Sequence, residues 1–137
     1  MTPHLSHYNS GSHKLIHYAV MENAISTVKV LVKQGHDVNA VTAFGETGLY
    51  LAAEQGYQNM IGALLNLGAD PRIHRNNGRT PLSIAVKKYD DNAKSEYPKE
   101  KEQRLRMIVE MLESAEHELS LDESEKDPYG QYQEEND

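Results

Sequence analysis

A repeat of 33 residues constrains the fold of this chain more than any other feature of its sequence. When the sequence is shifted by 33 positions, glycines align with glycines, alanines with alanines and apolar pairs with apolar pairs. The aligned positions are Gly35 with Gly68, Gly45 with Gly78, Ala19 with Ala52, Ala52 with Ala85, Asp37 with Asp70, Val28 with Ile61, and Leu31–Val32 with Leu64–Leu65. A fixed period of this length is typical of arrays in which one small structural unit stacks on the next.

The clearest unit consists of two short helical segments followed by a turn. Thr47 can cap the start of the first helix, and Gly56 can end it by adopting a positive φ. Apolar residues then recur at helical spacing over residues 60–65, which predicts a second helix. Asn77 and Gly78 form a dipeptide typical of a tight turn. Because neither helix can bury its apolar face alone, the units are expected to stack.

These units resemble those of the ankyrin repeat family. The family's G-x-T-P-L-H-x-A signature is matched by residues 78–85 (GRTPLSIA) and 45–52 (GETGLYLA), and more weakly by residues 12–19. Residues 35–40 (GHDVNA) and 68–70 (GAD) resemble the family's G-A-D-V-N-A segment. The resemblance implies an all-α solenoid of stacked helix-turn-helix units connected by hairpin loops.

The domain organisation follows from the repeat and from the distribution of charge. We expect an N-terminal extension (residues 1–11), a repeat array (12–118) and an acidic, disordered tail (119–137). The units of the array are expected at residues 12–44, 45–77 and 78–118. The third unit is longer, because Leu112 follows its counterpart Leu65 by 47 positions instead of 33. The charged insert near residues 89–103 is expected to form an exposed loop or an extended helix end.

The negative charge of the chain is concentrated near its C-terminus. The formal net charge is −7, and residues 113–137 contain ten acids and one base, Lys126. This leaves 11 acids and 13 Lys and Arg residues in residues 1–112. Such a tail is expected to be solvated and disordered, or to attract a basic partner. Its charge argues against direct binding of nucleic acid, because phosphates would be repelled.

Motifs typical of enzymes are missing from the sequence. It has no phosphate-binding glycine loop, no G-x-S-x-G turn and no Cys. His13 and His17 are four residues apart and could share a helix face, so a metal-dependent enzyme using this pair is an alternative hypothesis. No further metal-ligand motif accompanies them. The family resemblance gives His17 a structural role, as a hydrogen-bond partner of neighbouring backbone. We therefore predict no enzyme, no cofactor and no metal site.

The family resemblance implies that the chain binds a protein through its hairpin tips and the concave face of its first helices. The expected contact residues are Thr42, Phe44, Glu54, Arg72, His74, Arg75, Asn76, Lys87 and Tyr89. Phe44 is the only Phe in the chain, and it could anchor a partner or pack between hairpins. The family often has Asp at the positions of Thr42 and Arg75, so the departure here predicts a more basic tip.

We predict a protein–protein interaction module, with two more specific versions left open. One is an inhibitor or immunity-type protein that blocks a basic partner, and the other is an effector or adaptor. No run of about 18 apolar residues is present, so membrane insertion is not expected. The absence of Cys fits a reducing compartment. We therefore expect a cytoplasmic location, or a host cell's cytoplasm for an effector. A monomer is expected, with weak self-association as an alternative.

Overall fold

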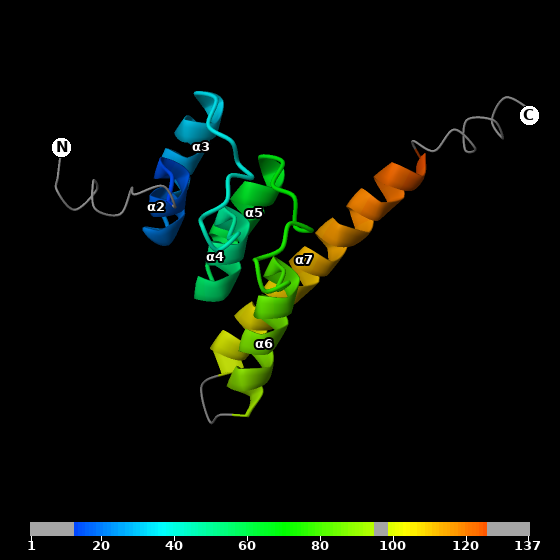
Figure 1. Ribbon diagram of the computed structural model, residues 1–137. Helices are drawn as coiled ribbons and strands as arrows, with labels where there is room; N and C mark the ends of the chain where they lie inside the picture. Colours follow the sequence, from blue (N-terminus) through cyan, green and yellow to red (C-terminus); the bar gives the residue numbers. More distant parts are fainter. Residues whose placement is uncertain (1–12, 95–98, 126–137) are drawn as a thin grey trace, which may run out of the picture.

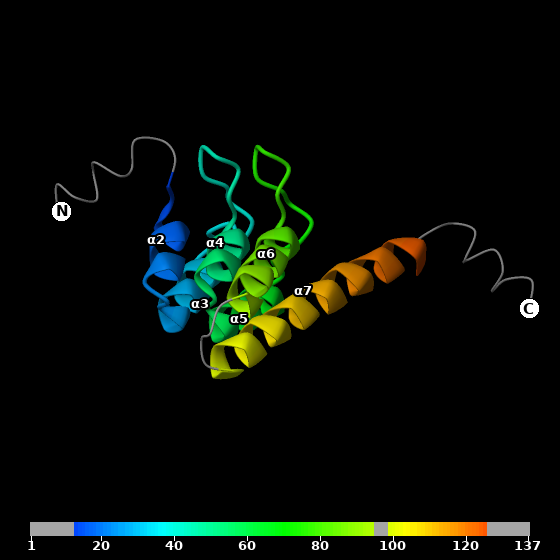
Figure 2. The same ribbon diagram turned by 90° about the horizontal axis from the view of Figure 1, so that it is seen from below.

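The computed structural model describes residues 13–94 and 99–125, and this part of the chain contains six helices and no strand. The helices are α2 (Leu15–Met21), α3 (Ile25–Lys33), α4 (Gly48–Gln55), α5 (Gln58–Asn66), α6 (Pro81–Ala93) and α7 (Lys99–Glu125). They form two layers, because α2, α4 and α6 contact one another in sequence, as do α3, α5 and α7 (Figures 1 and 2). The predicted all-α solenoid is confirmed.

Side chains cap the first helices of the second and third units. Thr47 accepts a hydrogen bond from the backbone N–H of Tyr50, and Thr80 accepts one from Ser83. These bonds satisfy amides that have no partner within the helix. Gly56 ends α4 in the left-handed conformation, with φ of 78°. Both ends of α4 therefore lie where the local sequence predicts them.

One continuous core connects the two layers. Its buried apolar residues are Ile16, Ala19, Val20, Val28, Leu49, Tyr50, Leu51, Ala52, Ala53, Met60, Ile61, Leu64, Ala69, Ile84, Ala85, Leu105, Ile108 and Leu112. All six described helices contribute to this set. The core therefore comes from stacking of the units, as their amphipathic helices require.

The third unit is built from longer helices than the second. Helix α6 has 13 residues where α4 has 8, and α7 has 27 where α5 has 9. Residues 89–93 of the insert continue α6, and residues 99–103 form the start of α7. The remaining insert includes residues 95–98, which lie outside the described residues. At about 1.5 Å per residue, α7 is about 40 Å long, and Figure 2 shows it projecting past the other helices.

The boundary expected for the acidic tail was wrong. Residues 119–125 are the last turns of α7, where we expected disorder. This segment contains no Gly or Pro that would end a helix, and Leu119 is half-buried on the same helix. The other expectations for the ends of the chain concern residues 1–12 and 126–137, which lie outside the described residues. None of the described helices combines the length and apolar character needed to cross a bilayer.

Candidate functional site

Two hairpin loops project from the same side of the array, one between α3 and α4 and one between α5 and α6 (Figure 2). We call residues 41–46 the first finger and residues 74–79 the second finger. The first is closed by a backbone hydrogen bond of 3.0 Å from Thr42 N to Glu46 O. The second has the equivalent bond from Arg75 N to Arg79 O, at 2.7 Å. The repeat therefore presents two similar loops side by side.

Hydrogen bonds fix the two fingers relative to each other. The backbone N–H of Asn76 donates to the carbonyl of Phe44 over 2.8 Å, and its Nδ2 donates to the carbonyl of Ala43 over 2.9 Å. Gly45 makes this approach possible. A Cβ at Gly45 would lie 2.9 Å from Asn76 N, and the φ of Gly45 is +82°. The fingers consequently form one support instead of two independent loops.

Arg75 lies at the centre of this junction. Its Nε is 3.3 Å from Glu46 Oε2, and both side chains are largely buried, with exposures of 29% and 10%. Its guanidinium carbon lies 5.6 Å from the ring centre of Phe44 and 5.8 Å from that of Tyr50. Both distances are within the range of cation–π attraction. Arg75 therefore connects the second finger to the first finger and to α4.

Two arginines, one in the second finger and one just before it, are paired with carboxylates. The charge of Arg75 is balanced by Glu46, the last residue of the first finger. Arg72 forms a two-pronged ion pair with Asp70, at 3.0 and 3.1 Å. These hydrogen bonds from Arg72 lower the pKa of Asp70. Each of these two arginines therefore has a carboxylate within contact distance, which offsets its positive charge.

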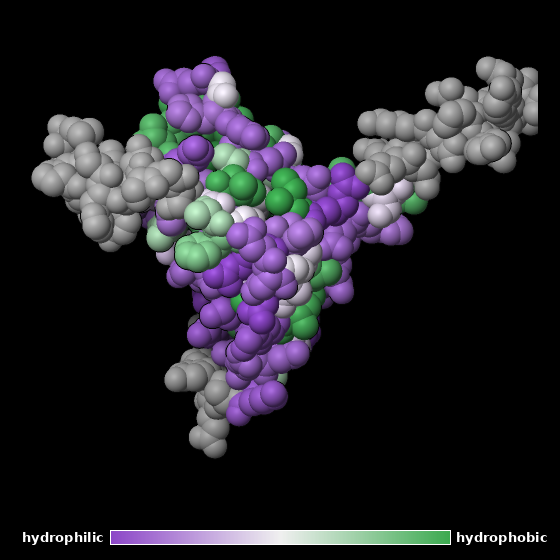
Figure 3. Space-filling view, in the orientation of Figure 1, coloured by the Kyte–Doolittle hydropathy of each residue, from purple (hydrophilic) through white to green (hydrophobic). Residues whose placement is uncertain are grey.

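Phe44 is the most exposed large apolar side chain on the fingers. It is 55% exposed even though Arg75 lies over its ring. Val41, also in the first finger, is exposed as well. Figure 3 shows apolar side chains gathered on this face over the two hairpins, surrounded by hydrophilic ones. The ring therefore contacts Arg75 of the neighbouring hairpin while about half of its surface stays exposed, and its role as an anchor for a partner stays a prediction.

Thr42 does not belong to the exposed surface, so its assignment as a contact residue was wrong. Its side chain is only 4% exposed. The hydroxyl donates to Glu46 Oε1 over 3.2 Å and accepts from the backbone N–H groups of Phe44 and Glu46. A hydroxyl is well suited to this turn, because it satisfies several nearby backbone groups. Thr42 stabilises the first finger from inside.

The remaining predicted residues do not form a single surface with the fingers. His74 is exposed on the second finger, and its Nδ1 lies 2.9 Å from Arg75 O. Lys87 is exposed on α6 and pairs with Asp91 over 2.9 Å. Tyr89 is half-buried and packs against the core. Glu54 lines a separate hollow of about 440 Å³ between α4, α6 and α7. The structure thus brings together Phe44, His74, Arg75 and Asn76, without the three helical residues.

Both ring nitrogens of His17 form hydrogen bonds with backbone groups. Its Nδ1 accepts from Lys14 N over 2.8 Å, so Nε2 carries the proton and donates to Ala40 O over 2.8 Å. Burial lowers the pKa of His17, although the hydrogen bond to Ala40 opposes the shift. The ring of His13 lies 5.8 Å away. Within residues 13–94 and 99–125, no group of three metal-ligand side chains is found. The geometry of His17 therefore matches the structural role that the family resemblance implies.

Sequence reasoning missed the partners of Arg75. Glu46 lies in the variable second position of the family signature, and Tyr50 replaces the family's His. The repeat itself offered a signal, because Arg75 and Thr42 are equivalent positions 33 residues apart and Glu46 contacts both. Contacts between equivalent positions of neighbouring units are common in stacked arrays. The same reasoning could have paired Asn76 with Ala43.

Comparison with known proteins assigns the family. The chain belongs to the ankyrin repeat family, because the family model described as ankyrin repeats (3 copies) matches residues 16–95. Members of this family generally mediate protein–protein interactions as non-enzymatic modules.

Several curated proteins are similar to parts of the chain. Rabankyrin-5 of Mus musculus is 34% identical across 53% of this chain and 7% of that protein. Protein phosphatase 1 regulatory subunit 27 of Homo sapiens is 32% identical across 56% of this chain and 49% of that protein. Ankyrin repeat protein 14 of vaccinia virus is 34% identical across 45% of this chain and 26% of that protein. The chain thus spans less than half the length of each of these relatives.

Proposed function

We propose that this chain is a non-catalytic module that binds a partner protein through its fingers and the adjacent face of α2, α4 and α6. The observation that carries the proposal is the 55% exposure of Phe44 on a loop held by hydrogen bonds. An aromatic ring on a rigid support loses little conformational entropy on binding. Family membership supports this class of function, and one relative is named as a regulatory subunit.

Within this surface the four finger residues have different roles. Phe44 is the apolar anchor, and Arg75 holds its ring in place while remaining paired with Glu46. Asn76 and His74 are polar residues at the edge of the apolar patch, where hydrogen bonds to a partner give specificity. Arg72 lies just before the second finger in the chain, and Glu54 and Lys87 lie on α4 and α6, outside this surface. The module acts as a monomer in the cytoplasm, consistent with a chain that has no Cys.

Quantitative affinity capture from the native source tests this surface. Phe44→Ala is expected to reduce recovery of the main partner about 10-fold or more, as loss of an aromatic anchor does. The matched control is Val30→Ala, because Val30 is 51% exposed on α3, away from the fingers. Circular dichroism should show that both variants remain folded. Undiminished recovery with Phe44→Ala would rule out the finger surface.

A further inference from the structure

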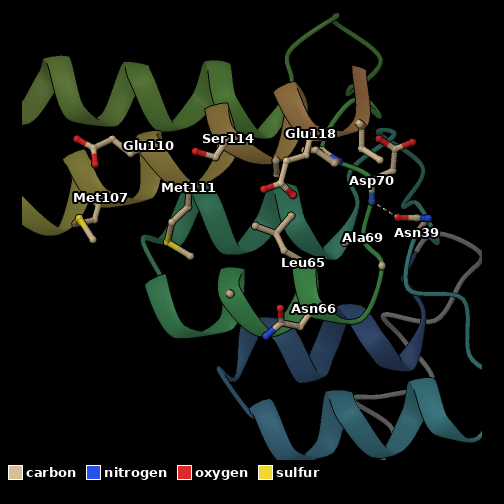
Figure 4. A pocket seen from close by; sticks show the side chains of 15 residues that line it. Asn39, Leu65, Asn66, Ala69, Asp70, Met107, Glu110, Met111, Ser114 and Glu118 are labelled. Atoms are coloured by element: carbon tan, nitrogen blue, oxygen red, sulfur yellow. Dashed lines mark hydrogen bonds between the residues drawn. The ribbon is translucent and has the colours of Figure 1, made fainter. Parts of the chain in front are cut away.

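A groove lies along the side of the array away from the finger tips, where α7 passes α5 (Figure 4). Its volume is about 730 Å³. One wall is α5 with the loop that follows it, where Leu65 contributes apolar surface. The other wall is α7, which contributes Met111, Ala115 and Leu119. In Figure 4, the side chains of Leu65 and Met111 face each other across the groove.

The groove exists because α7 continues its apolar face beyond the helices that cover it. Leu105, Ile108 and Leu112 are buried in the core, at spacings of three and four residues. The same spacing continues to Ala115 and Leu119, which are only half-buried. Such alternation marks one face of a helix that packs against another helix. The second half of this face lacks a covering helix in the described part of the chain.

Small residues on α5 and α7 bring the two walls of the groove close together. Gly62 lies on the α5 wall, and a Cβ at this position would come 3.5 Å from Met111 Cε. Ala115 is a second small residue, on the α7 wall of the groove. Helices pack with axes about 8–10 Å apart when the side chains between them are small enough.

The groove is rimmed by acidic side chains. Glu110 and Glu118 line it from α7. Residues 107–121 of α7 contain four Glu and no Lys or Arg. Outside the groove lining, burial raises the pKa of Glu116 and the neighbouring Glu113 raises it further. A ligand of this surface must therefore combine apolar contacts with positive charge.

We propose that the groove binds a basic amphipathic helix of a partner protein. The apolar face of that helix packs on Leu65, Met111 and Leu119, and its Lys or Arg side chains reach Glu110 and Glu118. The stretch from Met107 to Leu119 is about 18 Å long, so it accommodates about three helical turns. This arrangement is the helix-in-groove mode, with anchors at i, i+3, i+4 and i+7.

Charge argues against two occupants that the chain itself could supply, a second copy of α7 and residues 126–137. A second copy of α7 would bring the same four Glu against their equivalents, which is repulsive. Residues 126–137 carry four acids and one Lys, so they would be repelled as well. A basic helix of a different protein meets both requirements. This surface is separate from the fingers, and the inference does not depend on the function proposed for them.

A designed peptide serves as the probe. It has 18 residues of Leu and Lys, with Leu at i, i+3, i+4 and i+7, and carries a fluorescent label. Its binding to the full chain is followed by fluorescence anisotropy at constant ionic strength. We expect it to bind at least about 10-fold more tightly than a scrambled peptide of equal composition. A Leu/Glu peptide of the same pattern should not bind, because its charge matches that of the groove.

Matched variants locate the binding surface. Leu119→Gln is expected to weaken binding about 5-fold or more, whereas Leu121→Gln, at an exposed position outside the groove, should not. Glu110→Lys and Glu118→Lys are each expected to weaken it about 3-fold or more. Glu113→Lys is the control for charge, because Glu113 is exposed on α7 but does not line the groove.

Three results would overturn the inference. Equal binding of the ordered and scrambled peptides would show unspecific attraction between charges. If Glu113→Lys and Glu110→Lys weakened peptide binding equally, that would also show unspecific attraction between charges. A dimer seen by light scattering and dissociated by Leu119→Gln would identify a second copy as the occupant. Phe44→Ala should leave peptide binding unchanged, so failure at the groove is distinguishable from failure at the fingers.

Discussion

The fingers and the C-terminal half of α7 differ in whether their charged side chains have partners of opposite charge. On the fingers, Arg75 is paired with Glu46, and Asn76 spends its backbone and side-chain N–H groups on the neighbouring finger. Along residues 107–121 of α7, four Glu occur with no Lys or Arg in the same stretch. Polar groups on the fingers therefore mainly fix the structure, and the apolar Phe44 is left for recognition. The charges on α7 remain available to a partner.

The difference arises from how each region relates to the repeat. The fingers recur every 33 residues, so a polar group in one finger meets a residue near its equivalent in the other, as Asn76 meets Ala43. The C-terminal half of α7 has no equivalent in α5, which is only 9 residues long. Because the fingers repeat, their polar groups bond to each other. Because α7 is longer than α5, its C-terminal half has no equivalent helix to pack against.

The largest expected effect distinguishes the covered and uncovered halves of α7. Leu112 is fully buried, so Leu112→Ala should lower the free energy of unfolding by about 2–5 kcal/mol, through lost burial and the cavity left behind. Leu119 is half-buried in the open groove, where solvent and neighbouring side chains can fill the space. Leu119→Ala should cost about 1 kcal/mol or less. Urea unfolding followed by circular dichroism at 222 nm measures both.

Similar losses in the two variants would contradict the open groove. A large loss with Leu119→Ala would mean that something covers this half of α7 in solution. A small loss with Leu112→Ala would mean that α7 does not close the array.

A second comparison sets an enclosed ion pair on the fingers against an exposed one on α6. Arg75→Met keeps much of the aliphatic stem between the rings but leaves the largely buried Glu46 carboxylate without its cation. We expect a loss of about 1–2 kcal/mol in the free energy of unfolding. Lys87→Met removes the partner of Asp91, but both side chains are more than half exposed, so no measurable loss is expected. Equal losses would show that burial of the Arg75–Glu46 pair does not make it more important for stability than the exposed Lys87–Asp91 pair.

The sequence predicted the fold well because the repeat is read from many positions at once. Thr47 and Gly56 marked the ends of α4, and the matched apolar residues of each unit lie in the core. The end of α7 was missed because negative charge was taken as a sign of disorder over residues 119–125. Helical propensity and the half-buried Leu119 outweigh that charge.

The candidate site was less accessible, because it depends on contacts between units. The sequence identified Phe44, Arg75 and Asn76 as finger residues but could not show that Glu46 neutralises Arg75 or that Thr42 is buried. Side-chain direction in a tight turn depends on its hydrogen bonds, which composition does not reveal. The groove depends on where α7 crosses α5, and only the spacing from Leu105 to Leu119 hinted at it.

His17, which hydrogen-bonds to Ala40 just before the first finger, should make the stability of the protein depend on pH. Burial lowers the pKa of His17 below its ordinary value of 6.5, so the unfolded chain binds a proton more readily than the folded one. This contribution to stability is fully present above pH 6.5 and is lost as the pH falls toward the lowered pKa. Protonation would also place a second donor against Lys14 N. Unfolding free energies measured across this range should fall for the native chain and change less for His17→Gln. An identical pH dependence would show that another group is responsible.

The smallest expected effect compares two helical glycines, one in a closed junction and one at the open groove. Gly62→Ala adds a Cβ at 3.5 Å from Met111 Cε, an ordinary contact, and reduces the conformational freedom of the unfolded chain. It should stabilise the protein by about 0.4–1 kcal/mol. At Gly48, a Cβ would lie 3.1 Å from Cγ2 of the fully buried Val20, between α4 and α2. Gly48→Ala should therefore give no gain or a net loss, because Val20 has little room to move. Parallel urea unfolding curves resolve the difference, and stabilisation by both variants would show that the closed junction is looser than its contacts indicate.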